Sequence, residues 1–113
     1  ITIPVKGGFM KKINEKDVLF KNEKSGSKYL FNEKNFSGGV AYLNPDDEVK
    51  VHLHEDEREL FYFISGTPLF VAGEEKIRAN AGDGFVVDVK ELHGVLNDTK
   101  QMVKYVFVKI KEK

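Results

Sequence analysis

The sequence predicts an all-β fold, a sandwich, barrel or jelly roll built from short strands in a single domain. Apolar residues alternate with polar ones along most of the chain, and they nowhere recur at helical spacing over three turns. Turn sequences separate these segments about every ten residues, as in sandwiches and barrels. The length of 113 residues supplies one hydrophobic core and not two.

The N-terminal part of the chain, residues 1–38, is its least regular region. Polar and glycine-rich stretches predict exposed loops at 21–27 and 36–39. The segment Asn14–Phe20 fits either a short strand or a single helical turn. We therefore expect irregular N-terminal strands and loops ahead of the main body of the fold.

A core barrel is predicted over residues 39–110, within a single domain that comprises 1–113. Its strands are runs rich in β-branched and aromatic residues, bounded by Pro, Gly, Asn or Asp. We interpret the lysines at the end of the chain, Lys109, Lys111 and Lys113, as a solvated tail. The strands, including one ahead of the barrel, are expected at Tyr29–Phe31, Gly39–Leu43, Val49–Leu53, Glu59–Ser65, Pro68–Ala72, Lys76–Arg78, Phe85–Val89, His93–Asn97 and Met102–Ile110.

Charge and composition argue against several classes of function. The 18 Lys+Arg residues balance 18 Asp+Glu residues, so the chain has no general attraction for phosphate backbones and we expect no nucleic-acid partner. The apolar runs are far shorter than the ~20 residues that cross a bilayer, and we see no signal segment, so we expect no membrane partner and a cytoplasmic location. The absence of Cys excludes disulfides, thiolate metal ligands and a cysteine nucleophile.

The three histidines form the most specific pattern in the sequence. His52 and His54 lie two residues apart on a predicted strand, so both imidazoles project from one face. The carboxylate of Glu59 shares a strand face with apolar side chains, where it is costly to bury unless it is paired, protonated or bound to a cation. His93 is a candidate fourth ligand. Three imidazoles and one carboxylate suit Fe, Mn, Ni, Zn or Cu better than Mg or Ca.

Each of these residues also has an ordinary structural interpretation. A His-x-His pair is common on an exposed strand edge, and Glu59 alone is more often a solvated strand end. His93, which precedes a glycine, is by itself more often a turn residue than a ligand. The metal hypothesis therefore depends on all four residues fitting one spacing.

The segment 46–97 resembles the two sequence motifs of the cupin superfamily, the small double-stranded β-helix or jelly-roll proteins. In the first motif a glycine precedes a His-x-His pair, which is followed by a glutamate and a second glycine. Asp46 stands where the first glycine would be. The matching residues are His52, His54, Glu59 and Gly66.

The second motif is also present, with two departures. Gly82, His93 and Asn97 match it at the right spacing, whereas Asp88 and Lys90 replace a Pro and a Gly. Both departures fall on turn residues, so they affect the expected shape of the loop before His93 more than the ligand set. The resemblance implies a double-stranded β-helix or jelly-roll barrel that holds one divalent transition metal (Fe, Mn, Ni, Zn or Cu) per chain. Its implied ligands are His52, His54, Glu59 and His93.

In cupins the ligands point into the barrel, so residues on the same strand faces are expected to line a substrate pocket. Counting by two from Glu59 and from His54, and adding aromatic residues of the last strand, gives Phe61, Phe63, Lys50, Tyr105 and Phe107. Asn97 is expected either to close a turn or to support His93 from behind. Candidates for a general acid or an anion clamp are Tyr42, Tyr62, Tyr105 and Arg78.

The resemblance implies a metal-dependent cupin that acts on a small oxygen-bearing metabolite, of the dioxygenase, decarboxylase, isomerase or lyase type. The sequence does not choose among these reactions. One alternative is a non-catalytic small-ligand-binding cupin module, and another is a barrel that the metal only stabilises. We also expect a homodimer, because half-open jelly rolls leave strand edges and an apolar outer face that self-association can cover.

Overall fold

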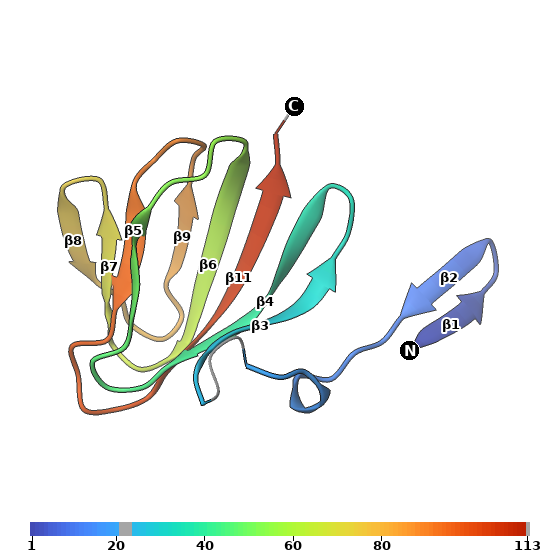
Figure 1. Cartoon of the computed structure of the whole chain (residues 1–113), viewed down its shortest axis with the longest axis horizontal. Helices are drawn as coiled ribbons and strands as arrows, with labels where there is room; N and C mark the ends of the chain where they lie inside the picture. Colours follow the sequence, from blue (N-terminus) through green and yellow to red (C-terminus); the bar gives the residue numbers. More distant parts are fainter. Residues whose placement is uncertain (21–23, 113) are drawn as a thin grey trace.

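A computed structural model describes residues 1–20 and 24–112, so Lys113 and part of the loop expected at 21–27 lie outside the described residues. The described chain is a single small all-β domain without an α-helix, as predicted (Figure 1). No helix in this part of the chain has the length and apolar character needed to span a membrane.

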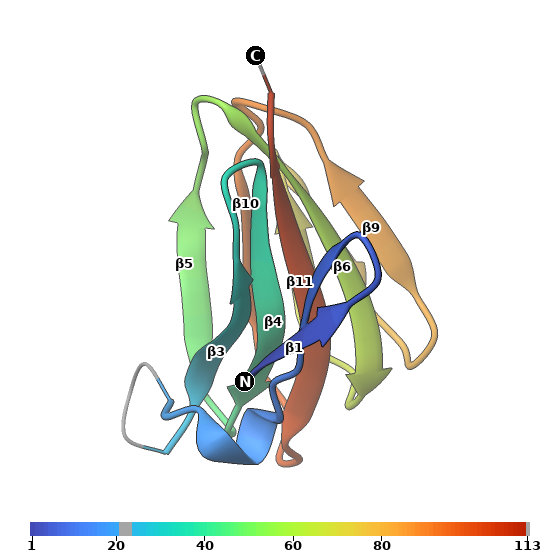
Figure 2. The ribbon, with the colours of Figure 1, turned by 90° about the vertical axis from the view of Figure 1, so that its right-hand side faces the viewer.

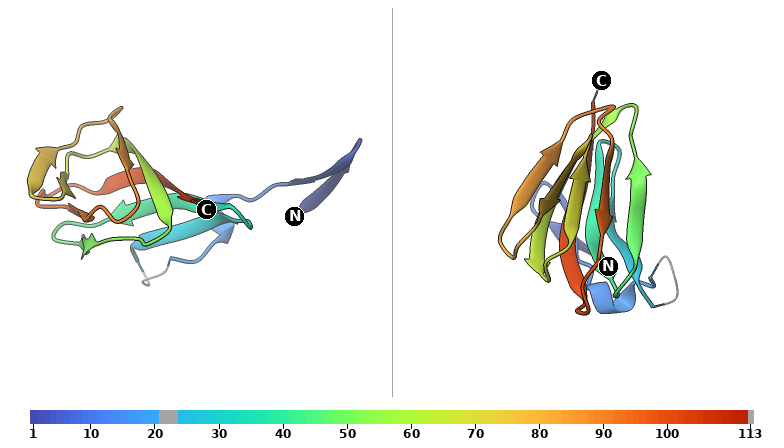
Figure 3. Two further views of the ribbon diagram at one scale, coloured as in Figure 1. Left: turned by 90° about the horizontal axis from the view of Figure 1, so that it is seen from above. Right: turned by 90° about the vertical axis from the view of Figure 1, so that its left-hand side faces the viewer.

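Two antiparallel sheets face each other and form the barrel (Figures 2 and 3). The five-stranded sheet has the order β3 (Gly26–Asn32), β4 (Phe36–Leu43), β11 (Val103–Lys111), β6 (Glu57–Ser65) and β9 (Gly84–Val87). The four-stranded sheet has the order β5 (Glu48–His52), β10 (His93–Leu96), β7 (Leu69–Ala72) and β8 (Glu75–Arg78). Neighbours in these orders are mostly not consecutive in sequence, which is the crossed connectivity of a jelly roll.

The hydrophobic core fills the space between the sheets and follows the two-residue period of the strands. On β6 the buried apolar side chains are Phe61 and Phe63, and on β11 Tyr105 and Phe107 are buried at the same spacing. From the opposite sheet Phe70 packs against them, and its ring centroid lies 4.9 Å from that of Phe61. The alternation read from the sequence thus identifies the inward faces of both long strands.

Two adjacent glycines in β4 let three strands approach closely. A Cβ atom at Gly39 would lie 1.9 Å from the carbonyl oxygen of Lys28 in β3, a distance that no side chain permits. Gly39 is paired with Tyr29 on one side and with Phe107 on the other. The Tyr29 ring packs edge-on against Phe107 of β11, with 5.1 Å between ring centroids. The exposed loop predicted at 36–39 is therefore wrong, since these residues belong to β4.

The segment Asn14–Phe20 contains a helical turn, which is one of the two predicted alternatives. A 3₁₀ helix, η1, spans Glu15–Asp17, and the side chain of Asn14 caps it by accepting a hydrogen bond from the Lys16 amide at 3.0 Å. The Glu15 carboxylate then contacts the Tyr42 hydroxyl of β4 and the Lys104 ammonium of β11. These contacts attach the irregular N-terminal region to the outer face of the five-stranded sheet.

The chain begins with a hairpin that the sequence did not predict. Its strands are β1 (Thr2–Val5) and β2 (Gly8–Lys11), and it stands away from the two sheets (Figures 1 and 3). Nearly all of its residues are exposed, so no buried face imposes the alternation that identifies a strand in sequence. Lys11 pairs with Glu33 near the β3–β4 turn at 3.0 Å.

Candidate metal centre

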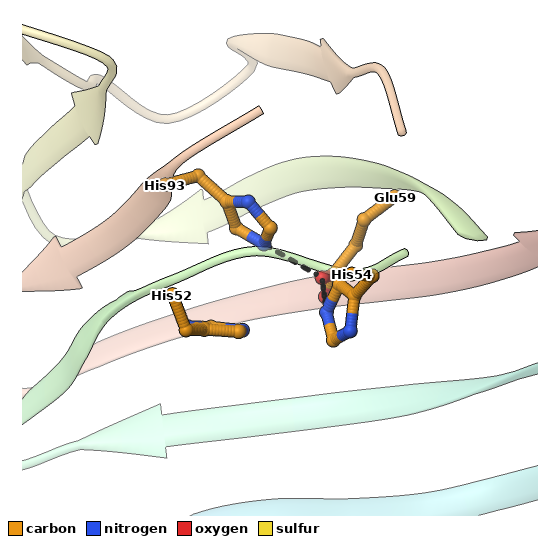
Figure 4. A group of neighbouring side chains, drawn as sticks. All are labelled: His52, His54, Glu59 and His93. Carbon is orange, nitrogen blue, oxygen red and sulfur yellow. Dashed lines mark hydrogen bonds and ion pairs between the residues drawn. The ribbon is translucent and has the colours of Figure 1, made fainter. Parts of the chain in front are cut away.

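The structure brings the four predicted ligands together from both sheets (Figure 4). His52 ends β5 and His54 lies just after it, His93 begins β10, and Glu59 lies on β6 of the opposite sheet. One potential ligand atom from each residue lies within 4.8 Å of all the others. Glu59 and His93 are 5% and 2% exposed, so half of the cluster is buried.

Backbone carbonyls orient two of the three imidazoles. The Nδ1 atom of His52 lies 2.7 Å from the carbonyl oxygen of Lys50, and Nδ1 of His93 lies 2.9 Å from that of Glu91. A carbonyl oxygen only accepts hydrogen bonds, so both Nδ1 atoms must carry a proton. In the neutral form of either ring the lone pair is then on Nε2, which is the atom available to a metal ion.

The Glu59 carboxylate makes this arrangement unfavourable without a cation. Its Oε1 atom lies 3.1 Å from Nε2 of His93 and 3.1 Å from Nε2 of His54. Because Nδ1 of His93 carries a proton, a neutral His93 ring would direct its Nε2 lone pair at this oxygen, and a proton on that ring or a metal ion would relieve the repulsion. The donor set, nitrogen from imidazole and oxygen from carboxylate, fits a divalent transition metal.

The protonation of the two imidazoles nearest Glu59 differs. Burial lowers the pKa of His93, but hydrogen bonds to Glu59 and to the Glu91 carbonyl outweigh this effect, and the pKa lies above its usual value. Burial also lowers the pKa of His54, and Glu59 only partly opposes it, so that pKa lies below its usual value. In the absence of a metal ion, His93 is therefore the better proton carrier of the two.

Both turn positions at which the expected motif glycine is replaced keep a left-handed backbone. Asp46 has φ 70° and Lys90 has φ 63°, a region that glycine adopts without strain. The Lys90 amide donates a hydrogen bond to the carbonyl oxygen of His54 at 2.8 Å. This bond ties the loop before His93 to the segment that carries His54, so the substitutions alter the residue types of the turns and not their geometry.

A cavity of about 150 Å³ is lined by three of the four candidate ligands, His52, Glu59 and His93. Its apolar wall contains Val49, Phe61, Val95 and Phe107. Its polar groups, besides the cluster itself, come from Ser27, Tyr29, Tyr105 and Lys109. Burial, with a further contribution from Glu59, raises the pKa of the Tyr105 phenol far above its usual value. At neutral pH this hydroxyl is therefore a hydrogen-bond donor and not a base.

Comparison with family models matches residues 39–109 to the cupin domain. The chain belongs to the cupin family. The matched region begins in β4 and ends in β11, so it contains all four cluster residues of this cupin. Comparison with curated proteins finds no match.

Solved structures with the same fold cover nearly the whole cupin chain. A protein from Thermus thermophilus has a TM-score of 0.78 at 22% identity, over 92% of this chain and 100% of its own. A predicted oxalate decarboxylase from Thermotoga maritima has a TM-score of 0.75 at 19% identity, over 89% and 99%. KdgF from Halomonas sp. has a TM-score of 0.73 at 18% identity, over 89% and 93%. At these identities the likeness shows the fold.

Three of the five residues expected in the pocket line the cavity of this cupin, and two do not. Phe61, Tyr105 and Phe107 contribute to its wall. Phe63 has the predicted inward orientation but is 0% exposed, and it lies deeper, against Phe70 and Phe85 in the core.

The prediction that Lys50 lines the pocket is wrong, and the reason is physical. Its side chain is exposed, and Val49 lines the cavity instead. In the pairing of β5 with β10, His52 is opposite His93 and Val49 is opposite Val95, so two residues of β5 face the single residue Gly94. This β-bulge reverses the inward and outward faces of β5, which a strict two-residue count from the histidines cannot register.

The expected role of Asn97 is also resolved. Its amide nitrogen donates to the carbonyl oxygens of Leu43 and Gln101 at 3.0 and 2.7 Å, and its amide oxygen accepts from the Thr99 hydroxyl. Asn97 therefore closes the β10–β11 turn, which is the first of the two predicted roles. It does not support His93, whose Nδ1 atom is held by Glu91.

The candidates for an acid or an anion clamp mostly lie elsewhere. Tyr42 contacts Glu15 on the outer face, Tyr62 is exposed, and Arg78 pairs with Asp98. Lys109 lines the cavity, so its assignment to a solvated tail is wrong. Period two already placed Lys109 on the face of Tyr105 and Phe107, and that signal could have identified it.

Proposed function

We propose that this cupin binds one divalent transition metal (Fe, Mn, Ni, Zn or Cu) through His52, His54, Glu59 and His93 and acts on a small oxygen-bearing metabolite. The observation that carries the proposal is the convergence of four ligand atoms within 4.8 Å of one another beside a cavity. The reaction would be of the dioxygenase, decarboxylase, isomerase or lyase type. The predicted oxalate decarboxylase from Thermotoga maritima is one cupin of this fold whose description names such a reaction.

A metal ion held by the four protein ligands could still bind a substrate. A five- or six-coordinate ion with four protein ligands keeps one or two positions open, and there it would polarise a substrate oxygen as a Lewis acid. The protein residues would then bind and orient the substrate. Apolar side chains form much of the cavity wall, and the Tyr105 hydroxyl, which is protonated at neutral pH, would donate a hydrogen bond to a ligand there.

Elemental analysis tests this proposal directly. The protein should be purified untagged, without chelators and without a nickel column, alongside the His54→Ala and Lys50→Ala variants. We expect close to one of the five metals per chain in the wild type, and a loss of about tenfold or more in His54→Ala because the ion loses a ligand. Lys50→Ala is the matched control, since Lys50 lies on β5, the strand just before His54, and its side chain is exposed.

Two results would contradict the proposal. One is the absence of metal in the wild type even after reconstitution with each of the five ions. The other is equal metal content in His54→Ala and Lys50→Ala. Metal binding without turnover of any small oxygen-bearing acid or sugar would instead favour a non-catalytic small-ligand-binding module.

A further inference from the structure

Lys109 is the last inward-facing residue of β11, and it lies beside the metal cluster. It is directly opposite Glu59 in the β6–β11 ladder, and residues paired in this way have Cβ atoms about 5 Å apart. Its side chain is half-buried and lines the same cavity as His52 and His93. The ammonium group therefore borders the ligand space, although the residue is close to the end of the chain.

The Lys109 ammonium retains most of its hydrogen-bonding capacity. It donates to the Tyr29 hydroxyl at 2.8 Å, and within residues 1–20 and 24–112 it forms no salt bridge. Two of its three N–H groups are thus left for another acceptor. The Tyr29 oxygen accepts from Lys109, so its own proton is free to be donated. Burial lowers the pKa of Lys109, but Tyr29 and the nearby Glu59 raise it above its usual value, and the group stays charged.

Two contacts orient Tyr29, although its side chain is 36% exposed. Its ring packs edge-on against Phe107 at 5.1 Å. The Lys109 ammonium also lies 5.4 Å from the centre of the Tyr29 ring. These contacts restrict the phenol, which reduces the conformational entropy that it loses when it binds a ligand.

The charges around the cavity favour an anion. Among its lining residues in the described chain, Glu59 is the one carboxylate, and it is directed at the imidazoles. A divalent ion with Glu59, Lys109 and neutral histidines would leave an excess of two positive charges. Glu57 lies outside the cavity wall, near Nδ1 of His54 at 3.8 Å. An uncompensated charge beside an apolar wall is costly, so a site loaded with metal would favour a negatively charged ligand.

The size of the cavity restricts that ligand. An apolar cavity of about 150 Å³ is large enough for benzene, which has six heavy atoms. Carboxylic acids of about three carbons with one further oxygen have the same number of heavy atoms. Phosphorylated pentoses and hexoses are more than twice as large.

We propose that Lys109 and Tyr29 form a carboxylate-binding pair, and that the ligand of this cupin is a small carboxylic acid whose second oxygen group faces the histidines. The carboxylate would accept one hydrogen bond from the ammonium and one from the phenol. The contact of the second oxygen group rests on the proposed metal site, whereas the carboxylate contact depends only on Lys109 and Tyr29.

Pyruvate and its neutral amide, pyruvamide, provide a matched pair of probes with six heavy atoms each. Calorimetric titration of the zinc-loaded protein should give pyruvate an affinity at least about tenfold higher than that of pyruvamide, as expected for a charge-assisted hydrogen bond. Lys109→Met should abolish this preference, and Tyr29→Phe should reduce it by a few fold. Lys104→Met is the control, because Lys104 is on the same strand but pairs with Glu15 outside the barrel.

The same titration in a chelator separates this proposal from the metal proposal. A pyruvate preference that persists without metal and disappears in Lys109→Met would support the carboxylate pair even if no metal binds. Equal affinities for the two probes in the wild type would overturn the pair. A preference that survives in Lys109→Met would also overturn it, whatever the metal content of the protein.

Discussion

At the scale of single residues, the same local contact orients two of the imidazoles. In both His52 and His93 the ring is held by the carbonyl group two residues earlier in the chain. This contact needs no dedicated side chain, so any residue type can precede the histidine at that position.

The stabilisation that His93 contributes to the metal-free protein should decline as the pH rises. Its pKa in the folded protein lies above 6.5, because its hydrogen bonds to Glu59 and the Glu91 carbonyl outweigh the effect of burial. The folded state therefore binds the proton more tightly than the unfolded state does. We expect the difference in free energy of unfolding between the wild type and His93→Gln, measured with urea in a chelator, to be largest below about pH 6 and to shrink toward about pH 8.

Saturating metal should reverse the direction of this dependence. Protons compete with the ion for the imidazoles, so the metal-loaded protein should lose stability as the pH falls through the histidine range. A difference between the wild type and His93→Gln that stays constant with pH in the chelator would contradict the role assigned to the ring.

Lys90 offers a second test at the residue scale. Its backbone has φ 63°, which costs an L-residue about 1–2 kcal/mol relative to glycine. Glycine also makes the unfolded chain more flexible, which stabilises the unfolded state and offsets about 0.4–1 kcal/mol of the gain. We expect Lys90→Gly to raise the free energy of unfolding by about 0.5–1 kcal/mol, measured by urea denaturation.

The control for Lys90→Gly is an exposed lysine inside a strand. Lys76 of β8 has no left-handed backbone to relieve, so Lys76→Gly should destabilise the protein. Similar effects of the two substitutions would show that the turn carries no strain at Lys90.

At the scale of the elements, the position of β3 depends on the glycine pair in β4. Gly39→Ala would place a Cβ atom 1.9 Å from the Lys28 carbonyl oxygen, and backbone atoms at that distance must separate. We expect this substitution to destabilise the protein by about 2–3 kcal/mol, as other overpacking changes do, and to displace Tyr29. Thermal unfolding measures the first effect, and near-ultraviolet circular dichroism measures the second when the Tyr29 signal is obtained as the difference from a Tyr29→Phe variant.

Gly8→Ala provides the comparison for Gly39→Ala. Gly8 lies in the β1–β2 hairpin, and no atom lies within 4 Å of the position where its Cβ would be. Its substitution should change the free energy of unfolding by no more than about 0.5 kcal/mol. A Gly39→Ala variant as stable as Gly8→Ala would mean that β3 is not held close to β4.

The clearest predictions of the fold come from strands in which a buried face controls the pattern. The long strands β6 and β11 alternate because one side of each faces the core, and the four ligands were identified because one spacing relates them. The β1–β2 hairpin has no buried face, so its sequence carries no such signal.

The features that escaped prediction arise from pairing between distant strands. The bulge that turns Lys50 outward exists only opposite Gly94 of β10. Tyr29 lies beside the cavity because β3 pairs closely with Gly39 of β4. Lys109 differs from these residues. The two-residue period of β11 already places it on the inward face, and only its position near the end of the chain suggested a solvated tail.

At the scale of the whole molecule, the N-terminal hairpin leaves apolar surface uncovered. Phe9 is 74% exposed, and a two-stranded hairpin is marginally stable on its own in water. Ile1, Val5 and Met10 are further exposed apolar residues of this segment. These observations support the expectation of a homodimer, in which a second copy of the chain would cover the hairpin.

Sedimentation at micromolar concentration tests the homodimer. We expect a mass of twice 12.9 kDa, and a shift toward the single-chain mass in Phe9→Asp because a charge would be buried at the contact. Leu92→Asp, an exposed apolar position in the β9–β10 loop, should leave the mass unchanged. A mass of 12.9 kDa for the wild type would contradict the dimer.

The ligands belong to different sheets, and this has a consequence for the kinetics of unfolding. An ion held by His52, Glu59 and His93 would act as a cross-link between the two halves of the barrel. Between Glu59 on one sheet and His93 on the other, such a cross-link closes a loop of about 34 residues, which in the unfolded chain costs roughly 4 kcal/mol of conformational entropy at 25 °C. The sheets could then separate only after the ion had left. The exchange rate of the bound ion would therefore set an upper limit on how fast the loaded protein unfolds.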